Sequence, residues 1–273
     1  MKIILFASTI FTAVVSIGLF SQELPTDLQG VWFYEIEGIE AIGIFSPTHS
    51  AWIGLKNNRK NLHGKTVTIE DKAEAFDAMW DIGITSCTLE EPGRVKSTFI
   101  NSHLPSKIGQ NFSWDFEIKD GYFYYWIIKP DGSRGYSGKA RKMADWNAPS
   151  PLASMNGLWQ YQDGAQGHFL MCGNYCIWFW GDNKHLPAPT SAEDKARIFD
   201  SFSSTAAIAQ KKENSGEGFG DILWHNLISS DIRNEKKIES TRSIKIADDT
   251  YETSMLNAQG SPTGQKWTVK RIK

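Results

Sequence analysis

The sequence lacks a strong charge of either sign. Its 29 lysine and arginine residues nearly balance 31 aspartate and glutamate residues, so the formal net charge is −2. Because nucleic-acid binding needs a basic face, this balance gives no reason to expect a DNA or RNA partner. The 273 residues also lack a Gly-x-Ser-x-Gly nucleophile elbow, a phosphate-binding loop and a His-Glu-x-x-His motif. Short motifs therefore assign no enzyme class, and whether the protein is an enzyme stays open.

Cysteine is scarce, with three residues in the whole chain. Cys172 and Cys176 are close in sequence, but residues four apart on one strand lie about 13 Å apart, too far for a disulfide. A bridge would require a turn at Gly173–Asn174. The alternative is that these cysteines are small residues of the core. No pair of histidines lies beside them at the spacing of metal ligands, so we expect no metal and no cofactor.

Long apolar runs are absent beyond the first residues of the chain. Lys2 is followed by a nearly uninterrupted apolar stretch from Ile3 to Phe20. This pattern predicts a signal peptide at 1–21, cleaved after Gly18 or Ser21. A retained membrane anchor is the alternative. Cleavage would give a secreted or periplasmic protein with no remaining membrane span.

The sequence repeats itself at an offset of about 125 residues. Gly30–Trp32 returns as Gly157–Trp159, and Glu70–Asp77 returns as Glu193–Asp200 with the same Glu-Asp-Lys-Ala start. We therefore predict two copies of one domain, at 26–146 and 154–273. The linker at 147–153 contains two prolines and is short, so we expect the domains to touch.

Each copy has one segment that predicts a helix. Thr68 precedes Asp71 by three residues, and Ser191 precedes Asp194 in the same way, which is the spacing of a capping box. We expect each helix to bury one face against a sheet, as a lid or plug, while its charged residues face water.

Strands account for most of the rest. Phe112–Ile118 alternates apolar and polar residues, Asp120–Gly121 is a typical hairpin turn, and Tyr122–Ile128 continues as an aromatic strand. Many short antiparallel strands favour a closed barrel, which leaves no exposed sheet edge. The predicted fold class is all-β, with two consecutive antiparallel barrels that each carry one short helix.

These features resemble the lipocalin superfamily. The likeness rests on the opening Gly30-Val31-Trp32 and a late basic strand. It is closer to small secreted bacterial lipocalin-like domains of unknown function, to which Thr48–Trp52, Phe76 and approximately Ser102–Gly109 also correspond. The second copy departs from this pattern, with tyrosine and serine in place of the two histidines.

The resemblance implies a structural role for the first-strand tryptophan of each copy. In lipocalins this ring lies across the closed end of the barrel and is capped by a basic side chain from the last strand. Here Trp32 would meet Arg141 or Lys142, and Trp159 would meet Lys270 or Arg271, through cation–π contacts.

The first domain holds the candidate site residues. His49 and His103 are candidate catalytic residues, because two histidines inside a barrel can act as general acid and base or bind a carboxylate. The alternative is that each one satisfies a backbone group at a strand end. An eight-stranded barrel is just wide enough for one small ligand, so its rings form either a pocket or a packed core. The candidate ligand-binding residues are Tyr34, Trp52, Tyr122, Tyr124 and Trp126.

Three functions remain open at this stage. The first is the binding of an apolar or amphipathic small molecule. The second is a cofactor-free isomerase or cyclase that acts on an apolar substrate. The third is a structural or interaction module of the cell envelope with solid barrels. We expect the working pocket in the first domain, because it keeps both histidines and the aromatic strand.

Overall fold

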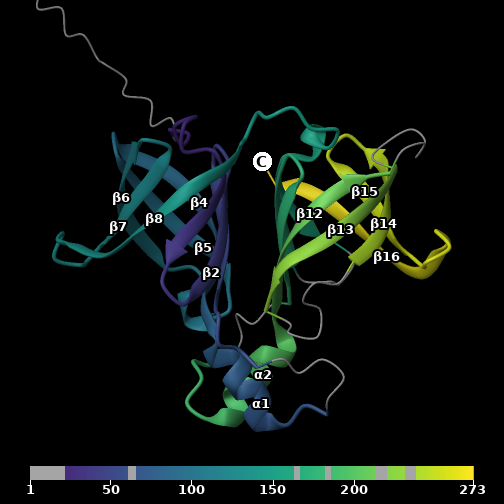
Figure 1. Ribbon diagram of the computed structural model, residues 1–273, viewed down its shortest axis with the longest axis horizontal. Helices are drawn as coiled ribbons and strands as arrows, with labels where there is room; N and C mark the ends of the chain where they lie inside the picture. The colour runs from purple at the N-terminus through teal and green to yellow at the C-terminus, as the bar shows by residue number, and fades with distance from the viewer. Residues whose placement is uncertain are drawn as a thin grey trace, which may run out of the picture.

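The computed structural model describes residues 22–60, 66–162, 167–181, 186–212, 220–230 and 238–272, and the predicted signal peptide lies outside them. The described chain forms two closed antiparallel barrels of eight strands each, with one short α-helix in each half (Figure 1). The predicted fold class is confirmed. No helix of the described residues is long and apolar enough to cross a membrane.

Barrel 1 follows an up-and-down order in which each strand pairs with the next and β8 closes on β1. Its strands are β1 (Gly30–Ile36), β2 (Ile39–Phe45), β3 (His49–Lys56), β4 (Met79–Glu91), β5 (Arg94–Ser102), β6 (Asn111–Lys119), β7 (Tyr122–Ile128) and β8 (Arg134–Asp145). Helix α1 (Ile69–Asp77) connects β3 to β4, and a single 3-10 turn, η1 (Pro105–Lys107), lies between β5 and β6.

Barrel 2 repeats this order after a second short turn, η2 (Ala153–Met155). Its strands are β9 (Gly157–Tyr161), β10 (Gly167–Cys172), β11 (Tyr175–Trp180), β12 (Ser203–Lys211), β13 (Gly220–Ser229), β14 (Ile238–Ala247), β15 (Thr250–Leu256) and β16 (Pro262–Ile272). Helix α2 (Ala192–Ser201) connects β11 to β12, as α1 connects the equivalent strands of barrel 1.

Local sequence explains the elements that were predicted. Thr68 accepts a hydrogen bond from the backbone N–H of Asp71, whose side chain accepts one in return, so the predicted capping box starts α1. Asp120 and Gly121 both have positive φ angles, 55° and 77°. A two-residue hairpin turn of this type requires positive φ at both positions, which is why Asp-Gly joins β6 to β7.

The two equivalent tryptophans of the repeat close one end of each barrel. Trp32 and Trp159 are fully buried, and each donates its indole N–H to the carbonyl four residues earlier, at 2.7 and 2.8 Å. Lys142 Nζ lies 5.1 Å from the Trp32 ring centroid, and the Arg271 guanidinium carbon lies 4.6 Å from that of Trp159. The predicted cation–π caps are confirmed, with Lys142 and Arg271 as the basic partners.

The barrels pack against each other through apolar side chains that point out of each barrel. Ile44, Ile53 and Ile82 of barrel 1 belong to the same buried cluster as Leu170 and Ile177 of barrel 2. Strands β2 and β3 contact β10, β11 and β12 across this seam. The interior of each barrel forms a separate cluster. The expectation that the two halves touch is therefore met by a buried seam that joins them.

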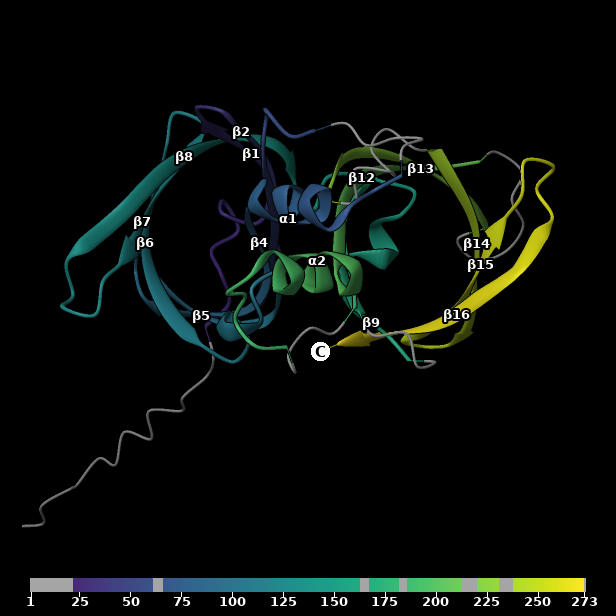
Figure 2. The same cartoon turned by 90° about the horizontal axis from the view of Figure 1, so that it is seen from below.

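The helices cover this seam: each buries one face as expected, but that face packs on the seam and on the other helix instead of closing a barrel. Seen from below, α1 and α2 lie side by side between the barrels (Figure 2). Phe76 of α1 joins the seam cluster. Lys72 pairs with Asp200 at 2.6 Å, and the equivalent Lys195 pairs with Asp77 at 2.7 Å. The same pair thus forms twice, with the two helices exchanging roles, as in the contact of a two-fold symmetric dimer. An apolar outer face on both barrels explains why the helices pack together there.

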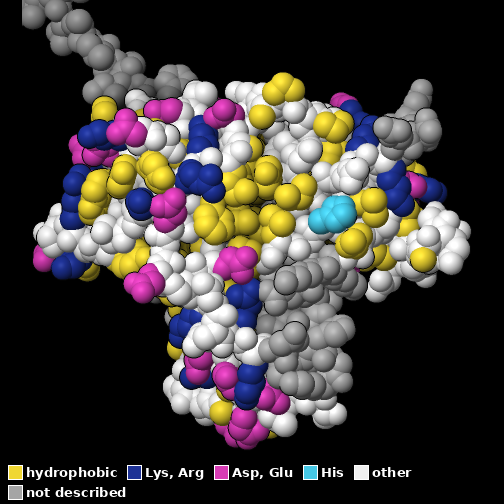
Figure 3. All heavy atoms as spheres, viewed as in Figure 1, with side chains coloured by type: hydrophobic (Ala, Val, Ile, Leu, Met, Phe, Trp, Pro, Cys, Tyr) yellow, Lys and Arg dark blue, Asp and Glu magenta, His cyan; other side chains and the backbone are white. Residues whose placement is uncertain are grey.

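The surface reflects this arrangement (Figure 3). Side chains of both charges alternate on the helical stem at the bottom of the view, whereas hydrophobic side chains gather between the two barrels. All three cysteines are buried and free. Cys172 and Cys176 are therefore core residues and do not form the alternative disulfide. Among the described residues, no group of three or more potential metal ligands occurs.

Candidate functional site

Barrel 1 encloses a cavity of about 350 Å³ that opens at the end near α1. Trp80 and Asp81, which directly follow α1, line its mouth, whereas the Trp32 end of the barrel is closed. Ten aromatic rings line the cavity, among them those of Trp52, Phe99 and Phe123. Many ligand pockets measure about 300–1,000 Å³ and are mostly apolar, so this cavity has the size and lining of a small-molecule site.

Glycines in the wall explain why so many rings leave an open interior. A Cβ atom at Gly83 would lie 2.8 Å from the Trp52 ring, and one at Gly54 would lie 2.7 Å from the Trp80 ring. Gly43 lets the Tyr34 ring lie against the backbone in the same way. Real Cβ atoms do not approach rings this closely, so only glycine fits. The rings therefore pack directly against the backbone of the wall at these glycines.

Polar side chains gather at the mouth of the cavity. Lys107 Nζ and the Asp81 carboxylate form an ion pair at 2.9 Å, with both side chains about one third exposed. The same ammonium lies 5.4 Å from the centroid of Phe99, and Gln110 and Asn111 complete the polar rim. Because the two charges neutralise each other, the mouth presents hydrogen-bonding groups without a net charge.

A small buried polar cluster lies deeper in the barrel. Ser50 and Thr85 share a hydrogen bond of 2.8 Å, and the Cys87 thiol lies 3.4 Å from both hydroxyl oxygens. Ser97 contacts the same sulfur and accepts a hydrogen bond from Trp114 Nε1 at 2.9 Å. Burial raises the pKa of the Cys87 thiol. A protonated thiol is a weak nucleophile, so this cluster is neutral, and Ser50 is its member that lines the cavity.

Two tyrosine hydroxyls inside the cavity are also held neutral. Tyr34 and Tyr125 meet edge to face, with ring centroids 5.8 Å apart. Burial is the main reason that the pKa of each rises well above the usual value for tyrosine. Both remain phenols, able to donate and to accept a hydrogen bond.

His103 lies outside the cavity and satisfies the backbone. Its Nδ1 lies 3.2 Å from the N–H of Ile82, and its ring packs against Phe76 at 5.9 Å. In barrel 2 the equivalent Ser230 accepts a hydrogen bond from the N–H of Ser204 at 2.8 Å. The two side chains therefore make the same contact, at a strand end. Burial lowers the pKa of His103.

His49 also points away from the cavity. It precedes Ser50, which lines the cavity, and successive side chains on a strand face opposite sides. Its Nδ1 lies 2.8 Å from Thr48 Oγ1, and its backbone N–H donates to Ser46 Oγ at 2.8 Å. Burial lowers its pKa to about 4. The structure thus does not bring the two predicted catalytic residues to the predicted binding residues.

The predicted binding residues divide between two faces. Tyr34 and Trp52 line the cavity. Tyr122, Tyr124 and Trp126 do not, and this part of the prediction needs correction. They share a face of β7 on which Arg134 lies over the Trp126 ring at 4.2 Å and Lys139 lies over the Tyr122 ring at 4.8 Å. The cavity is lined instead by the alternate residues of β7, which sequence reasoning missed: Phe123, Tyr125 and Ile127.

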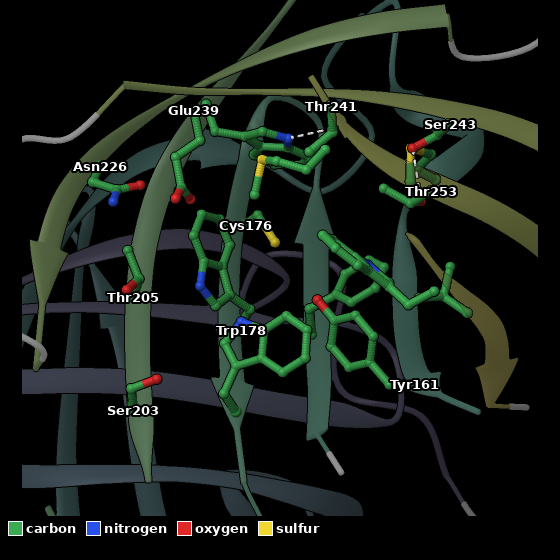
Figure 4. A pocket seen from close by; sticks show the side chains of 17 residues that line it. Tyr161, Cys176, Trp178, Ser203, Thr205, Asn226, Glu239, Thr241, Ser243 and Thr253 are labelled. Carbon is green, nitrogen blue, oxygen red and sulfur yellow. Dashed lines mark hydrogen bonds between the residues drawn. The ribbon is translucent and has the colours of Figure 1, made fainter. Parts of the chain in front are cut away.

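Barrel 2 has a smaller cavity of about 160 Å³ (Figure 4). Strand pairing places Phe169, Trp180 and Thr205 at the positions of the three wall glycines of barrel 1. These side chains all line the cavity, and each adds a side chain at a position where barrel 1 has none. The loss of the glycines explains the smaller interior.

Comparisons with known proteins identify no family. No family model matches the chain, and no curated protein does. Among solved structures, the dehydratase domain of RzxB from Pseudomonas fluorescens is 10% identical over 66% of this chain and 74% of its own, with a TM-score of 0.13. A DNA polymerase III subunit beta sliding clamp from Bartonella birtlesii is 6% identical over 90% and 78%, with a TM-score of 0.12.

Neither likeness is close enough to bear on fold or function. The two antiparallel barrels of eight strands fit a tandem lipocalin-like fold. Membership of the suspected bacterial family stays a prediction.

Proposed function

We propose that the protein binds an apolar or amphipathic small molecule that contains a ring, held in the cavity of barrel 1. The observation that carries this proposal is a ring-lined interior of about 350 Å³ with a polar, charge-balanced mouth. An apolar ring system would stack on Trp52 and Phe99, and a polar end would meet Asp81 and Lys107 at the rim. The neutral hydroxyls deeper in the cavity would orient a single polar substituent.

Binding is favoured over the isomerase or cyclase alternative by the positions of the histidines. That alternative needs proton-handling groups beside the ligand. His49 and His103 are engaged elsewhere, and the Asp81 and Lys107 charges are paired with each other. A secreted or periplasmic location, predicted from 1–21, belongs to the same proposal, and determining the N-terminal residue of the protein from its host tests it.

Displacement of a neutral fluorescent probe tests the binding proposal. N-phenyl-1-naphthylamine is apolar and contains rings, and we expect saturable binding to the full chain with enhanced fluorescence. Mass spectrometry of molecules extracted from the purified protein would then identify natural ligands, which compete with the probe. Recovery of such a ligand in unchanged form after incubation distinguishes binding from turnover.

Gly83→Thr is the variant that places the site. It introduces into barrel 1 the residue that barrel 2 carries at the equivalent position, where Thr205 shares a 2.9 Å hydrogen bond with Ser229. The new side chain displaces the Trp52 and Phe99 rings into the cavity, because a Cβ atom there lies 2.8 and 2.9 Å from them. Probe affinity should fall at least tenfold, or about 1.4 kcal/mol. The matched control is Thr205→Ser in barrel 2. Equal affinities for Gly83→Thr and the wild type would exclude barrel 1 as the site.

A further inference from the structure

Most polar side chains that line the barrel 1 cavity already have a partner inside the protein. The two charged ones, Asp81 and Lys107, pair with each other at 2.9 Å. Five uncharged ones make hydrogen bonds: Ser50 with Thr85, Trp114 with Ser97, Gln110 with the Ser106 carbonyl, Asn111 with Thr98, and Tyr125 with Tyr136. These groups do not depend on a ligand for a partner.

Two lining side chains differ from this pattern. The Tyr34 hydroxyl and the Trp52 indole N–H have no hydrogen-bond partner among the described residues. Partnerless polar atoms that are sealed from solvent do occur in the described chain, for example Ser204 Oγ, but Tyr34 and Trp52 contribute none of them. Both groups therefore remain accessible from the cavity that their side chains line. Trp80 is half-buried at the mouth, where water can serve as its partner.

Gly43 brings these two groups to the same level of the barrel. A Cβ atom at Gly43 would lie 2.9 Å from the Tyr34 hydroxyl oxygen, so the side chain of Tyr34 reaches from β1 across to β2. Gly43 itself pairs with Trp52 on β3. The hydroxyl of Tyr34 therefore lies over the residue that is directly opposite Trp52.

Barrel 2 keeps both side chains but not the glycine between them. Strand pairing gives the equivalents of Tyr34, Trp52 and Gly43 as Tyr161, Trp178 and Phe169. Phe169 occupies the place where barrel 1 admits the hydroxyl. The Tyr161 ring instead stacks on Trp180, with centroids 4.3 Å apart. The arrangement of the two accessible groups is thus specific to barrel 1.

The chemistry of these groups restricts the polar part of a ligand. An indole N–H can only donate a hydrogen bond, and a phenol also has a proton to donate. Burial keeps Tyr34 protonated, because it raises the pKa of the hydroxyl. A carbonyl oxygen has two lone pairs and can accept from both donors. A carboxylate does not suit the site, since Asp81 already neutralises Lys107 and an unpaired charge in an apolar cavity is costly.

We propose that the ligand of barrel 1 is a ring compound with an uncharged carbonyl group, whose oxygen accepts hydrogen bonds from the Tyr34 hydroxyl and from Trp52 Nε1. This inference rests on the proposed binding of a ring compound in barrel 1, and it names the polar substituent of that compound. The ring lies against the aromatic wall, and the carbonyl is directed at the strands β1 to β3.

The test uses two uncharged compounds of the same shape. 2-Acetylnaphthalene carries a carbonyl group, and 2-isopropenylnaphthalene has a C=CH₂ group in its place. Each competes with N-phenyl-1-naphthylamine for the full chain and for Tyr34→Phe, so the comparison forms a double-mutant cycle. Tyr34→Phe should weaken binding of the ketone about tenfold, because the carbonyl loses its donor, and leave binding of the alkene within about twofold.

Tyr122→Phe is the matched control. It removes a phenol hydroxyl from the outer face of β7, where Tyr122 does not line the cavity, and should change neither affinity. Infrared spectroscopy supplies a second readout. The carbonyl stretch of the bound ketone should lie below its frequency in hexane and move back upward in Tyr34→Phe.

The outcomes separate this inference from the proposed function. Equal effects of Tyr34→Phe on the ketone and the alkene, or a bound carbonyl stretch at its hexane frequency, would overturn the carbonyl inference and leave the binding proposal standing. Failure of the ketone to displace a bound probe would do the same. Absence of saturable binding of the probe and of both naphthalenes would refute the proposed function itself, and this inference with it.

Discussion

Acidification should destabilise this protein well above the pH at which carboxylates titrate. His49 has a pKa of about 4 in the folded protein, against about 6.5 in an unfolded chain, because burial disfavours the imidazolium. Below pH 6.5 the unfolded state therefore takes up a proton that the folded state does not. Stability is fully present above the unfolded pKa and falls with pH until the folded pKa is reached.

The magnitude follows from the size of the pKa difference. Each pH unit in this window removes about 1.4 kcal/mol of the free energy of unfolding, so His49 alone accounts for about 3 kcal/mol by pH 4. The pKa of His103 is lowered as well, which adds loss in the same direction. Against a typical total of about 5–15 kcal/mol, this is a large fraction.

Barrel 2 supplies matched substitutions for the assay. Tyr175 and Ser230 occupy the positions of the two histidines, and Ser230 makes the same backbone hydrogen bond. Urea unfolding of the wild type and of His49→Tyr/His103→Ser is followed by tryptophan fluorescence at pH 7.5, 5.5 and 4.5. The wild type should lose at least about 2 kcal/mol between the first and last pH, and the double variant should lose much less. The same pH dependence in both proteins would refute the reasoning.

The remaining predictions concern stability. Trp32→Ala should lower the free energy of unfolding by about 3–5 kcal/mol, the usual cost of removing a large buried ring, and calorimetry should still show one transition because the seam couples the barrels. Two separate transitions would mean that the seam does not couple them. Lys72→Asp should destabilise the helix pair by about 0.2–1 kcal/mol, since the Lys72–Asp200 pair is partly exposed. Adding Asp200→Lys should restore the charge pair, and a double variant no more stable than the single one would exclude a contribution from this ion pair.

The barrels, their hairpins and the tryptophan caps could be predicted because each depends on local pattern or on the repeat. Contact between the barrels was expected from the short linker, but the strands that form the seam were not identified, although the sequence carried their signal. Strand β2 has Ile42 and Ile44 on one face and apolar residues on the other face too. Strand β3 likewise has Ile53 on one face and Trp52 on the other. Strands that are apolar on both faces are buried on both. That pattern indicates a barrel whose outer wall is covered, which the helices and the partner barrel do here.

The correct face of β7 was also within reach of sequence reasoning. The two-residue Asp120–Gly121 turn fixes the pairing of Lys119 with Tyr122, and therefore that of Trp114 with Ile127. Because paired residues point to the same side of the sheet, the inward face of β6 determines the inward face of β7. The prediction instead followed the residues with polar tips. Alternation along β3 also separates His49 from Trp52, which lie on opposite faces of that strand. The role of His103 had no such local signal, since it depends on where neighbouring strands end.

Paired exchanges between the barrels explain how one fold came to hold two different cavities. In barrel 1, Trp114 on β6 donates its indole N–H to Ser97 on β5 at 2.9 Å. In barrel 2 the tryptophan has changed strands, and Trp224 on β13 donates to Thr241 on β14 at 2.8 Å. The hydrogen bond depends on the pair and not on which strand carries the ring, so the exchange preserves the buried contact while moving a large side chain across the lumen.

The neighbouring ion pair also exchanges its two residues between strands. Arg94 on β5 pairs with Asp115 on β6 in barrel 1, whereas Asp221 on β13 pairs with Arg242 on β14 in barrel 2. Such swaps conserve the bonds that hold the strands together and change only the shape and polarity of the space they enclose. Changes in the interior therefore have little effect on the stability of the barrel itself. For that reason we expect the two cavities to differ in ligand rather than to be a working copy and a degenerate one.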